Sequence, residues 1–162
     1  MQTYYGTKKL NAKPMTRGEY NKLRNRDLPV NENPDDPGYL VEYLDGFRGN
    51  HHEFVGYISW SPKEVFETAY QPTTAMSFGH AVEALKNGDR VARAGWNGKG
   101  MFLFLVPGST FQVNRPPLNR IYEEGTPINY HAHIDMRTAD GTIVPWLASQ
   151  TDVLANDWQI VS

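Results

Sequence analysis

Proline and glycine recur along the whole chain and limit the length of any helix or strand. The 162 residues include 11 prolines and 14 glycines, residues that interrupt regular structure and favour turns. We therefore expect many turns and short elements rather than long helices. Apolar residues make up 40% of the chain and aromatic residues 12%. That content is sufficient for a packed core, so we expect a folded chain and not global disorder.

The order of predicted elements indicates an α+β fold. Short helical patterns alternate with short strand patterns, and neighbouring strands are joined by turns that favour antiparallel pairing. A proline-containing stretch at residues 71–74 has the composition of a linker. We therefore expect two small units, residues 1–72 and residues 73–162, with short helices and mostly antiparallel strands.

The first unit contains a predicted hairpin and two predicted helices. Residues 38–43 and 56–60 are β-favouring runs joined by a polar loop. Thr16 begins one predicted helix, as the N-cap of a capping box. Ser61 is the expected N-cap of a second helix, with a proline at its first helical position. Residues 29–38 carry three prolines and predict a loop.

The second unit has a clearer pattern. Ser77 is the expected N-cap of a helix over residues 78–87, which Gly88 ends. A helical turn is predicted at residues 152–156. The long proline-containing segment at residues 107–127 is predicted to be an irregular excursion. Strands are predicted at residues 90–93, 101–106, 133–138, 142–146 and 158–161.

Composition excludes several classes of function. With no cysteine, the chain has no disulfide framework, no Cys-ligated metal and no cysteine nucleophile. A net charge of −2 gives no electrostatic reason to expect nucleic acid or an anionic membrane as partner. The longest apolar run, residues 101–106, is too short to span a bilayer, and the N-terminus shows no signal-peptide core. We expect a protein of the reducing cytoplasm.

One pattern suggests a metal site. In a strand, His131, His133 and Asp135 share one face, and such residues can bind a divalent metal. The alternative is a solvated strand edge. The chain has no nucleophile elbow, Walker loop or dinucleotide-binding glycine motif. The sequence gives no local support for catalysis, and we expect no metal and no cofactor.

Two tryptophans suggest a ligand with a flat face. Trp96 lies between glycines in a turn, and Trp146 is followed by the four polar residues 149–152. An aromatic face beside short hydrogen-bonding groups suits a nucleobase, and stacking contributes roughly 1–3 kcal/mol per base. The alternative is that both tryptophans pack the core of a small domain.

Four motifs carry a resemblance to a known family. They are MSFGHA at residues 76–81, RAGWNGKGMF at 93–102, DMRTADG at 135–141 and VPWLASQTDVLANDW at 144–158. With these motifs in this order, residues 76–161 resemble the Thoeris anti-defence 2 family of phage proteins. Residues 38–43 and 56–66 resemble a segment of uncharacterised phage proteins, which indicates no chemistry.

The resemblance implies a small α+β protein that assembles as a homo-oligomer. It also implies binding of cyclic nucleotide signals made by bacterial immune enzymes, without cleavage. By motif, it assigns base stacking to Trp96 and polar contacts to residues 149–157. We extend the site to Asn97, Phe102 and Trp146 by inference. The expected ligand-binding residues are Trp96, Asn97, Phe102, Trp146, Ser149, Gln150, Thr151, Asp152 and Asn156.

The sequence thus predicts a phage anti-defence protein that sequesters a cyclised ADP-ribose or a cyclic dinucleotide in the infected host. It is not expected to be an enzyme. Two alternatives stay open: a metal-dependent enzyme that degrades such signals through His131, His133 and Asp135, and a protein-interaction module whose first 72 residues bind a host protein. Residues 113–129, with Arg115 and Arg120, form an insertion that either adds phosphate contacts or decorates the surface.

Overall fold

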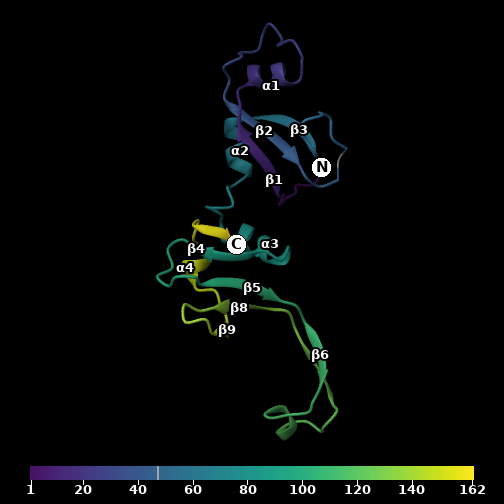
Figure 1. Cartoon of the computed structure of the whole chain (residues 1–162), viewed down its shortest axis with the longest axis vertical. Helices are drawn as coiled ribbons and strands as arrows, with labels where there is room; N and C mark the ends of the chain where they lie inside the picture. The colour runs from purple at the N-terminus through teal and green to yellow at the C-terminus, as the bar shows by residue number, and fades with distance from the viewer. Residues whose placement is uncertain (47) are drawn as a thin grey trace. The chain divides into compact units, whose positions relative to one another are not determined.

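A computed structural model describes residues 1–46 and 48–162 (Figure 1). The chain divides into two compact units, Met1–Gln71 and Pro72–Ser162. Every strand pair among the described residues is antiparallel, and none of their helices exceeds nine residues. The α+β class with short helices and mostly antiparallel strands is therefore confirmed. No helix in the described part of the chain has the length and apolar character needed to cross a membrane.

The first unit is built on a three-stranded sheet. Its strands are β1 (Leu10–Pro14), β2 (Gly38–Tyr43) and β3 (Tyr57–Pro62), in the order β1-β2-β3. The predicted hairpin is the β2–β3 pair. Its buried hydrophobic residues, Leu40, Val41 and Ile58, lie on these two strands. Because adjacent residues point to opposite faces, Leu40 and Val41 give the sheet two buried faces.

The two helices of this unit begin in different ways. Helix α1 (Arg17–Leu23) has the expected capping box: the Glu19 amide donates to Thr16 Oγ1 at 3.2 Å, and the Thr16 amide donates to the Glu19 carboxylate at 2.7 Å. Helix α2 (Lys63–Ala69) has Pro62 as N-cap, so the prediction for Ser61 was wrong. Ser61 is still paired with Tyr39 in the sheet. Strand pairing therefore holds that backbone extended past the expected helix start.

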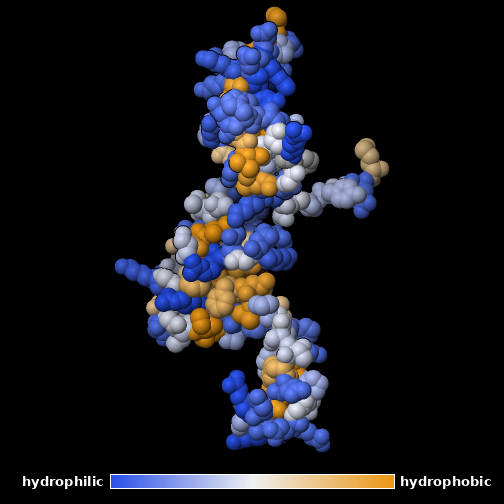
Figure 2. All heavy atoms as spheres, turned by 45° about the vertical axis from the view of Figure 1, so that its right-hand side comes forward, coloured by the Kyte–Doolittle hydropathy of each residue, from blue (hydrophilic) through white to orange (hydrophobic). Residues whose placement is uncertain are grey.

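The second unit is a five-stranded sheet with helices on one face. The order is β10-β4-β5-β8-β9, so β5 is the central strand. Figure 2 shows hydrophobic side chains gathered around this sheet. The strands are β4 (Arg90–Arg93), β5 (Phe102–Val106), β8 (His133–Arg137), β9 (Ile143–Pro145) and β10 (Trp158–Val161).

The central strand separates two faces of that sheet. Leu103 is fully buried opposite Val91 and Met136, and it packs in one cluster with the buried residues of helix α3 (Phe78–Lys86). Phe102 and Phe104 alternate with Leu103 and therefore point to the opposite face. Helix α3 thus covers one face of the sheet, and the two phenylalanines lie on the other.

Serine residues mark the helix starts of this unit, as predicted for Ser77. Ser77 is the N-cap of α3, but its hydroxyl bonds to Nδ1 of His80 at 2.9 Å instead of to the backbone. The predicted helical turn at residues 152–156 is placed too late, because α4 spans Gln150–Val153. Ser149 and Asp152 form a capping box that begins the helix upstream.

The stretch predicted as a linker lies partly along the second sheet. The Thr73 carbonyl accepts a hydrogen bond from the Ile160 amide at 2.9 Å. Met76 and Trp158 exchange two backbone hydrogen bonds, of 2.7 and 3.1 Å. Residues 73–76 therefore cover the outer edge of β10, which leaves fewer free backbone groups there.

Residues 107–127 are more regular than predicted. They contain β6 (Ser109–Gln112), which pairs with β7 (Pro127–Tyr130), and the 3-10 helix η1 (Leu118–Arg120) lies between these strands. The ribbon continues outward from the β5–β8 pair (Figure 1). Val113 is only 1% exposed. This local burial and the strand pairing replace the irregular excursion that the prolines suggested.

Candidate functional site

Arg93 is the charged centre of the candidate site. It is the last residue of β4, and its side chain is 15% exposed. Its Nε donates to Asp157 at 2.8 Å and its Nη1 donates to Asp152 at 3.0 Å. The hydrogen bond with Asp157, and then the one with Asp152, raise the pKa of Arg93. Arg93 therefore joins β4 to the chain on both sides of residues 153–156.

Asp157 fixes the turn that carries Trp96. Its second carboxylate oxygen accepts the Gly95 amide at 2.8 Å. A Cβ on Gly95 would lie 2.9 Å from that oxygen, so the close approach requires glycine here. The hydrogen bond from Arg93 lowers the pKa of Asp157, and the Gly95 amide lowers it further. Asp157 is therefore held as a carboxylate at neutral pH.

Asp152 links the ion pair to the aromatic residues. One of its carboxylate oxygens accepts Trp96 Nε1 at 3.3 Å as well as Arg93, and the other accepts the Ser149 hydroxyl at 2.6 Å. Its carbonyl accepts Trp158 Nε1 at 3.0 Å. Burial acts to raise the pKa of Asp152, but hydrogen bonds from Ser149, Arg93 and Trp96 outweigh it and the pKa is lowered. This residue is thus fully engaged inside the protein.

Four aromatic rings meet beside these carboxylates. Trp158 is fully buried at their centre. The Trp96 ring lies 5.4 Å from it at 78°, and the Trp146 ring lies 6.1 Å from it at 82°. Phe78 contacts both Trp146 and Trp158. Edge-to-face contacts of this kind are favourable, and they fix the two half-buried tryptophans at the margin of the core.

Four predicted ligand residues lie near members of this cluster along the chain and have exposed polar side chains. Asn97 follows Trp96 in the turn, while Gln150 and Thr151 open helix α4 and Asn156 follows it. All four are exposed. Within the described part of the chain, none of these side chains makes a hydrogen bond. They are therefore available to an external ligand beside Trp96 and Trp146.

Phe102 lies apart from the other predicted residues. It faces the side of the sheet away from α3, whereas Trp96 and Trp146 pack against the core on the α3 side. The guanidinium of Arg90 lies 5.0 Å from the Phe102 ring centre, and that of Arg137 lies 5.9 Å from it. The structure thus brings Trp96, Trp146, Ser149 and Asp152 together and leaves Phe102 on the other face.

The sequence motifs do not reveal the roles of Arg93, Asp157 and Trp158 in this arrangement. A signal was present for Arg93: it lies two residues after the buried Val91, so strand alternation directs it toward the core. A cation directed toward a core needs a carboxylate partner. The two aspartates near the C-terminus were candidates, but only the strand pairing places them within reach.

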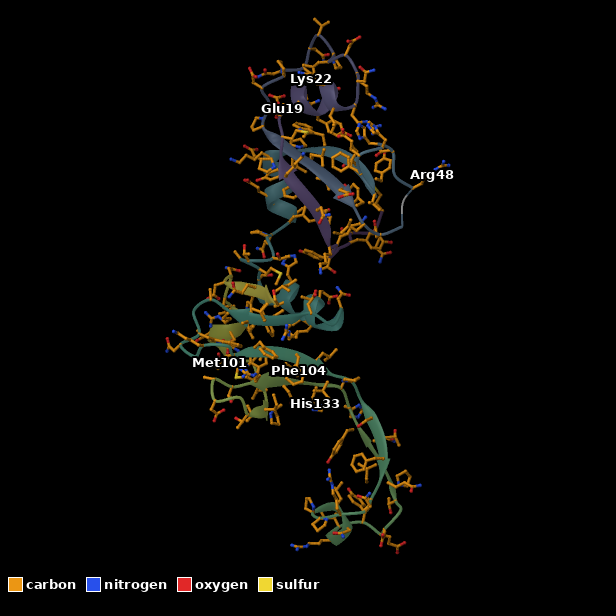
Figure 3. All side chains as sticks on the ribbon, in the orientation of Figure 1. Glu19, Lys22, Arg48, Met101, Phe104 and His133 are labelled. Carbon is orange, nitrogen blue, oxygen red and sulfur yellow. The ribbon has the colours of Figure 1, made fainter. Side chains whose placement is uncertain are left out.

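The histidine motif forms a pair and not a cluster. Figure 3 labels His133 at the start of β8. Its Nε2 lies 3.7 Å from Asp135 Oδ1, and its Nδ1 lies 3.0 Å from the backbone carbonyl of His131. His131 precedes the strand, so the expected shared face of three residues was wrong. Among the described residues, no group of three or more potential metal ligands comes together.

Comparison with known proteins relates these residues to a family. Residues 76–161 match the family model of the Thoeris anti-defense 2-like domain. The chain is also similar to a protein named Thoeris anti-defense 2 from Bacillus phage SP01, with 43% identity over 99 residues. That alignment covers 55% of this chain and 98% of the phage protein. The matched span contains Arg93, Trp96, Asp152 and Trp158, and the resemblance carried by the four motifs is confirmed.

Proposed function

The chain belongs to the Thoeris anti-defense 2-like family, and we propose that it binds a cyclic nucleotide immune signal and holds it intact. Membership of this family supports a role in phage anti-defence. The finer proposal is that the ligand is a cyclised ADP-ribose or a cyclic dinucleotide, and that the protein lowers its free concentration in the infected bacterium. Sequestration requires tight binding and not turnover.

The presentation of Trp96 is the observation that carries this proposal. Its ring edge is held against Trp158 and its Nε1 is held by Asp152. The indole is therefore oriented before any ligand arrives, which lowers the entropy that binding costs. A base stacked on such a ring gains roughly 1–3 kcal/mol. Asn97, next in the turn, offers an amide to the edge of that base.

The phosphates of the ligand need a cation that is not already neutralised. Arg93 is paired with two carboxylates and cannot supply this charge. Lys99 lies three residues after Trp96, is exposed and makes no ion pair within the described residues. We assign the phosphate contact to Lys99. A dissociation constant of 1 nM corresponds to about −12 kcal/mol, which needs several such contacts together.

A second copy of the chain would complete the site. Leu147 is 92% exposed and Leu154 is 75% exposed, on either side of helix α4. Val144 and Val153 are also exposed. Apolar side chains gathered beside a ligand site are typical of an interface. In the proposed homo-oligomer these residues meet a partner and enclose the exposed face of Trp96.

The arrangement favours binding over hydrolysis. The two carboxylates nearest Trp96 belong to Asp152 and Asp157, and hydrogen bonds lower the pKa of both. Neither is placed to carry a proton at neutral pH, as a general acid must. These two carboxylates therefore offer no general acid beside Trp96, which supports retention of the ligand.

Calorimetric titration with a panel of cyclic ADP-ribose isomers and cyclic dinucleotides tests the proposal. We expect tight binding, and intact ligand after heat denaturation of the complex. Trp96→Ala should weaken binding at least about tenfold, a loss of about 1.4 kcal/mol. Trp60→Phe, in the first unit, is the matched control and should bind normally. Lys99→Gln should weaken binding as well.

Three other outcomes would favour different functions. Recovery of chemically altered ligand would establish an enzyme, if a chelator or the His133→Ala substitution abolishes the alteration. Capture of a host protein by residues 1–72 that survives Trp96→Ala, with no nucleotide bound, would establish an interaction module. A monomer by light scattering at the concentration that binds ligand would remove the second copy from the proposal.

A further inference from the structure

The tip of the β6–β7 ribbon forms a hollow that is separate from the Trp96 site. Residues 113–126 fold back at the end of the ribbon (Figure 1) and leave an open space of about 770 Å³ against it. Small-molecule sites occupy about 300–1,000 Å³. The hollow is lined by two aromatic residues, Phe111 and Tyr130, by the polar residues Gln112, Asn114 and Arg115, and by apolar residues that include Leu118.

The aromatic side chains provide two walls at an angle. Phe111 and Tyr130 lie on one face of the ribbon, because their strand partners are Ile128 and Ser109. Their ring centres are 5.2 Å apart, with the planes inclined at 66°. A third flat ring can pack into the corner between an edge and a face. This geometry favours a planar ligand.

Arg115 brings a positive charge to the same hollow. Two other arginines of the unit are engaged: Arg93 pairs with two aspartates, and Arg137 donates to the Gly100 carbonyl at 2.9 Å. Within the described residues, the Arg115 side chain has neither a hydrogen bond nor an ion pair, although Glu123 lies on the same loop. Its planar fork of donors therefore remains available for a phosphate or carboxylate.

Two amides add hydrogen-bonding capacity beside this cation. Gln112 and Asn114 line the hollow, and neither side chain has a hydrogen-bond partner within the described part of the chain. Each amide carries donors and an acceptor. Together they match a ring that has both nitrogen and oxygen at its edge.

The walls of the hollow are fixed by backbone structure. Val113 is 1% exposed, its amide donates to the Thr126 carbonyl at 2.9 Å, and its carbonyl accepts the Gly125 amide at 2.8 Å. The segment from Asn114 to Gly125 is thus closed into a loop by paired backbone groups. A site with fixed walls loses little entropy on binding.

We propose that this hollow binds a small planar anion: a heteroaromatic ring that carries one phosphate or carboxylate group. The ring packs against Phe111 and Tyr130, its edge meets the amides of Gln112 and Asn114, and the anionic group meets the guanidinium of Arg115. The site lies on the ribbon and shares no residue with the Trp96 site. It therefore goes beyond the proposed function.

Calorimetric titration of the full chain tests this site with two kinds of anion. The probes are the 5′-monophosphates AMP, GMP, CMP and UMP, and the planar carboxylate orotate. We expect saturable binding of at least one probe. If only the nucleotides bind, the anionic group that the site recognises is a phosphate; if only orotate binds, it is a carboxylate. Arg115→Gln should weaken binding about tenfold or more. Arg120→Gln, in the same tip but outside the lining, should change it less than about twofold.

Tryptophan fluorescence separates this site from the Trp96 site. The four tryptophans, at positions 60, 96, 146 and 158, all lie outside the ribbon. Binding in the hollow should leave their fluorescence unchanged and should survive Trp96→Ala. Phe111→Leu and Arg115→Lys should each weaken binding, with circular dichroism as the check that the variant is folded. Failure of every probe to bind, or binding unaffected by both Arg115→Gln and Phe111→Leu, would overturn the proposal.

Discussion

Replacing Arg93 by methionine removes the cation that joins β4 to both ends of the segment between Asp152 and Asp157. Methionine keeps much of the side-chain length and volume, so the change is chiefly electrostatic. The Arg93 side chain is 15% exposed and that of Asp152 is 13% exposed, whereas that of Asp157 is 33% exposed. Without Arg93, two carboxylates remain close together with no cation to neutralise them.

The expected cost follows from that burial. Removing one partner of a fully buried ion pair costs about 3–5 kcal/mol. The exposure of Asp157 reduces the loss, and we expect about 2–4 kcal/mol for Arg93→Met. In a domain of roughly 60–100 residues, each kcal/mol shifts Tm by about 4–8 °C. The second unit should therefore unfold at least about 8 °C lower in the variant.

Thermal unfolding followed by circular dichroism measures this difference, with Arg90→Met as the matched control. Arg90 begins the same strand but is exposed, and its guanidinium lies over the Phe102 ring, so its replacement should cost at most about 1 kcal/mol and lower Tm less than Arg93→Met does. A double-mutant cycle of Arg93→Met with Asp157→Asn should show a coupling of about 1 kcal/mol or more. Equal losses of Tm in Arg93→Met and Arg90→Met would refute the conclusion that Arg93 holds the site together.

The same variant has a defined pH dependence. The pKa values of Asp152 and Asp157 are lowered in the folded protein, so their stabilising contribution is present above about pH 4, the unfolded pKa. It is lost as pH falls through the folded pKa values. In Arg93→Met each carboxylate loses one of the hydrogen bonds that lower its pKa. The difference in free energy of unfolding between the unsubstituted protein and Arg93→Met should therefore shrink as pH falls below about 4. A difference that does not change with pH would show that lost packing, and not lost charge, is responsible.

Three further changes test other parts of the second unit. Gly95→Ala places a methyl group 2.9 Å from Asp157 Oδ2 and should lower the free energy of unfolding by about 1–3 kcal/mol, measured by urea titration. Asp140 should titrate by NMR with a pKa of about 2, lowered chiefly by the Thr138 hydroxyl; Thr138→Val should raise that pKa, and an unchanged value would exclude the hydroxyl as the cause. Because the folded pKa is lowered, this stabilisation is present above about pH 4 and is lost toward pH 2. Leu103→Ala, at a fully buried position, should cost about 2–5 kcal/mol in urea unfolding, and a loss below 1 kcal/mol would contradict its place in the core.

Local signals in the sequence were sufficient for much of the fold. The capping box of Thr16 and Glu19 forms as predicted. The predicted strands at residues 133–138 and 142–146 correspond to β8 and β9, which pair across Asp140 and Gly141. In each case the interacting groups are only a few residues apart. The family motifs are likewise continuous stretches of sequence, so the sequence alone relates residues 76–161 to the family.

Predictions failed where a distant partner changed the local preference. Ser61 has the sequence context of an N-cap, but pairing with Tyr39 keeps it in β3. The prolines near residues 107–127 indicated an irregular loop, yet β6 and β7 pair across it. In both cases pairing with another strand gives the backbone several hydrogen bonds at once. A helix start at Ser61 or an irregular loop near residues 107–127 would give it fewer.

The sequence by itself determined the class of fold, the short elements and the family, and it predicts Trp96 as a ligand-binding residue. Only the tertiary structure decided which groups surround that tryptophan. Arg93 lies 59 residues from Asp152 and 64 from Asp157, and the pairing of β10 with β4 brings them together. The same sheet places Phe102 on the face opposite Trp96. The spacing of residues along one strand determines which side chains share a face of that strand. Strand order and register determine which face lies toward the core and which residues of other strands are neighbours, and both depend on the whole sheet.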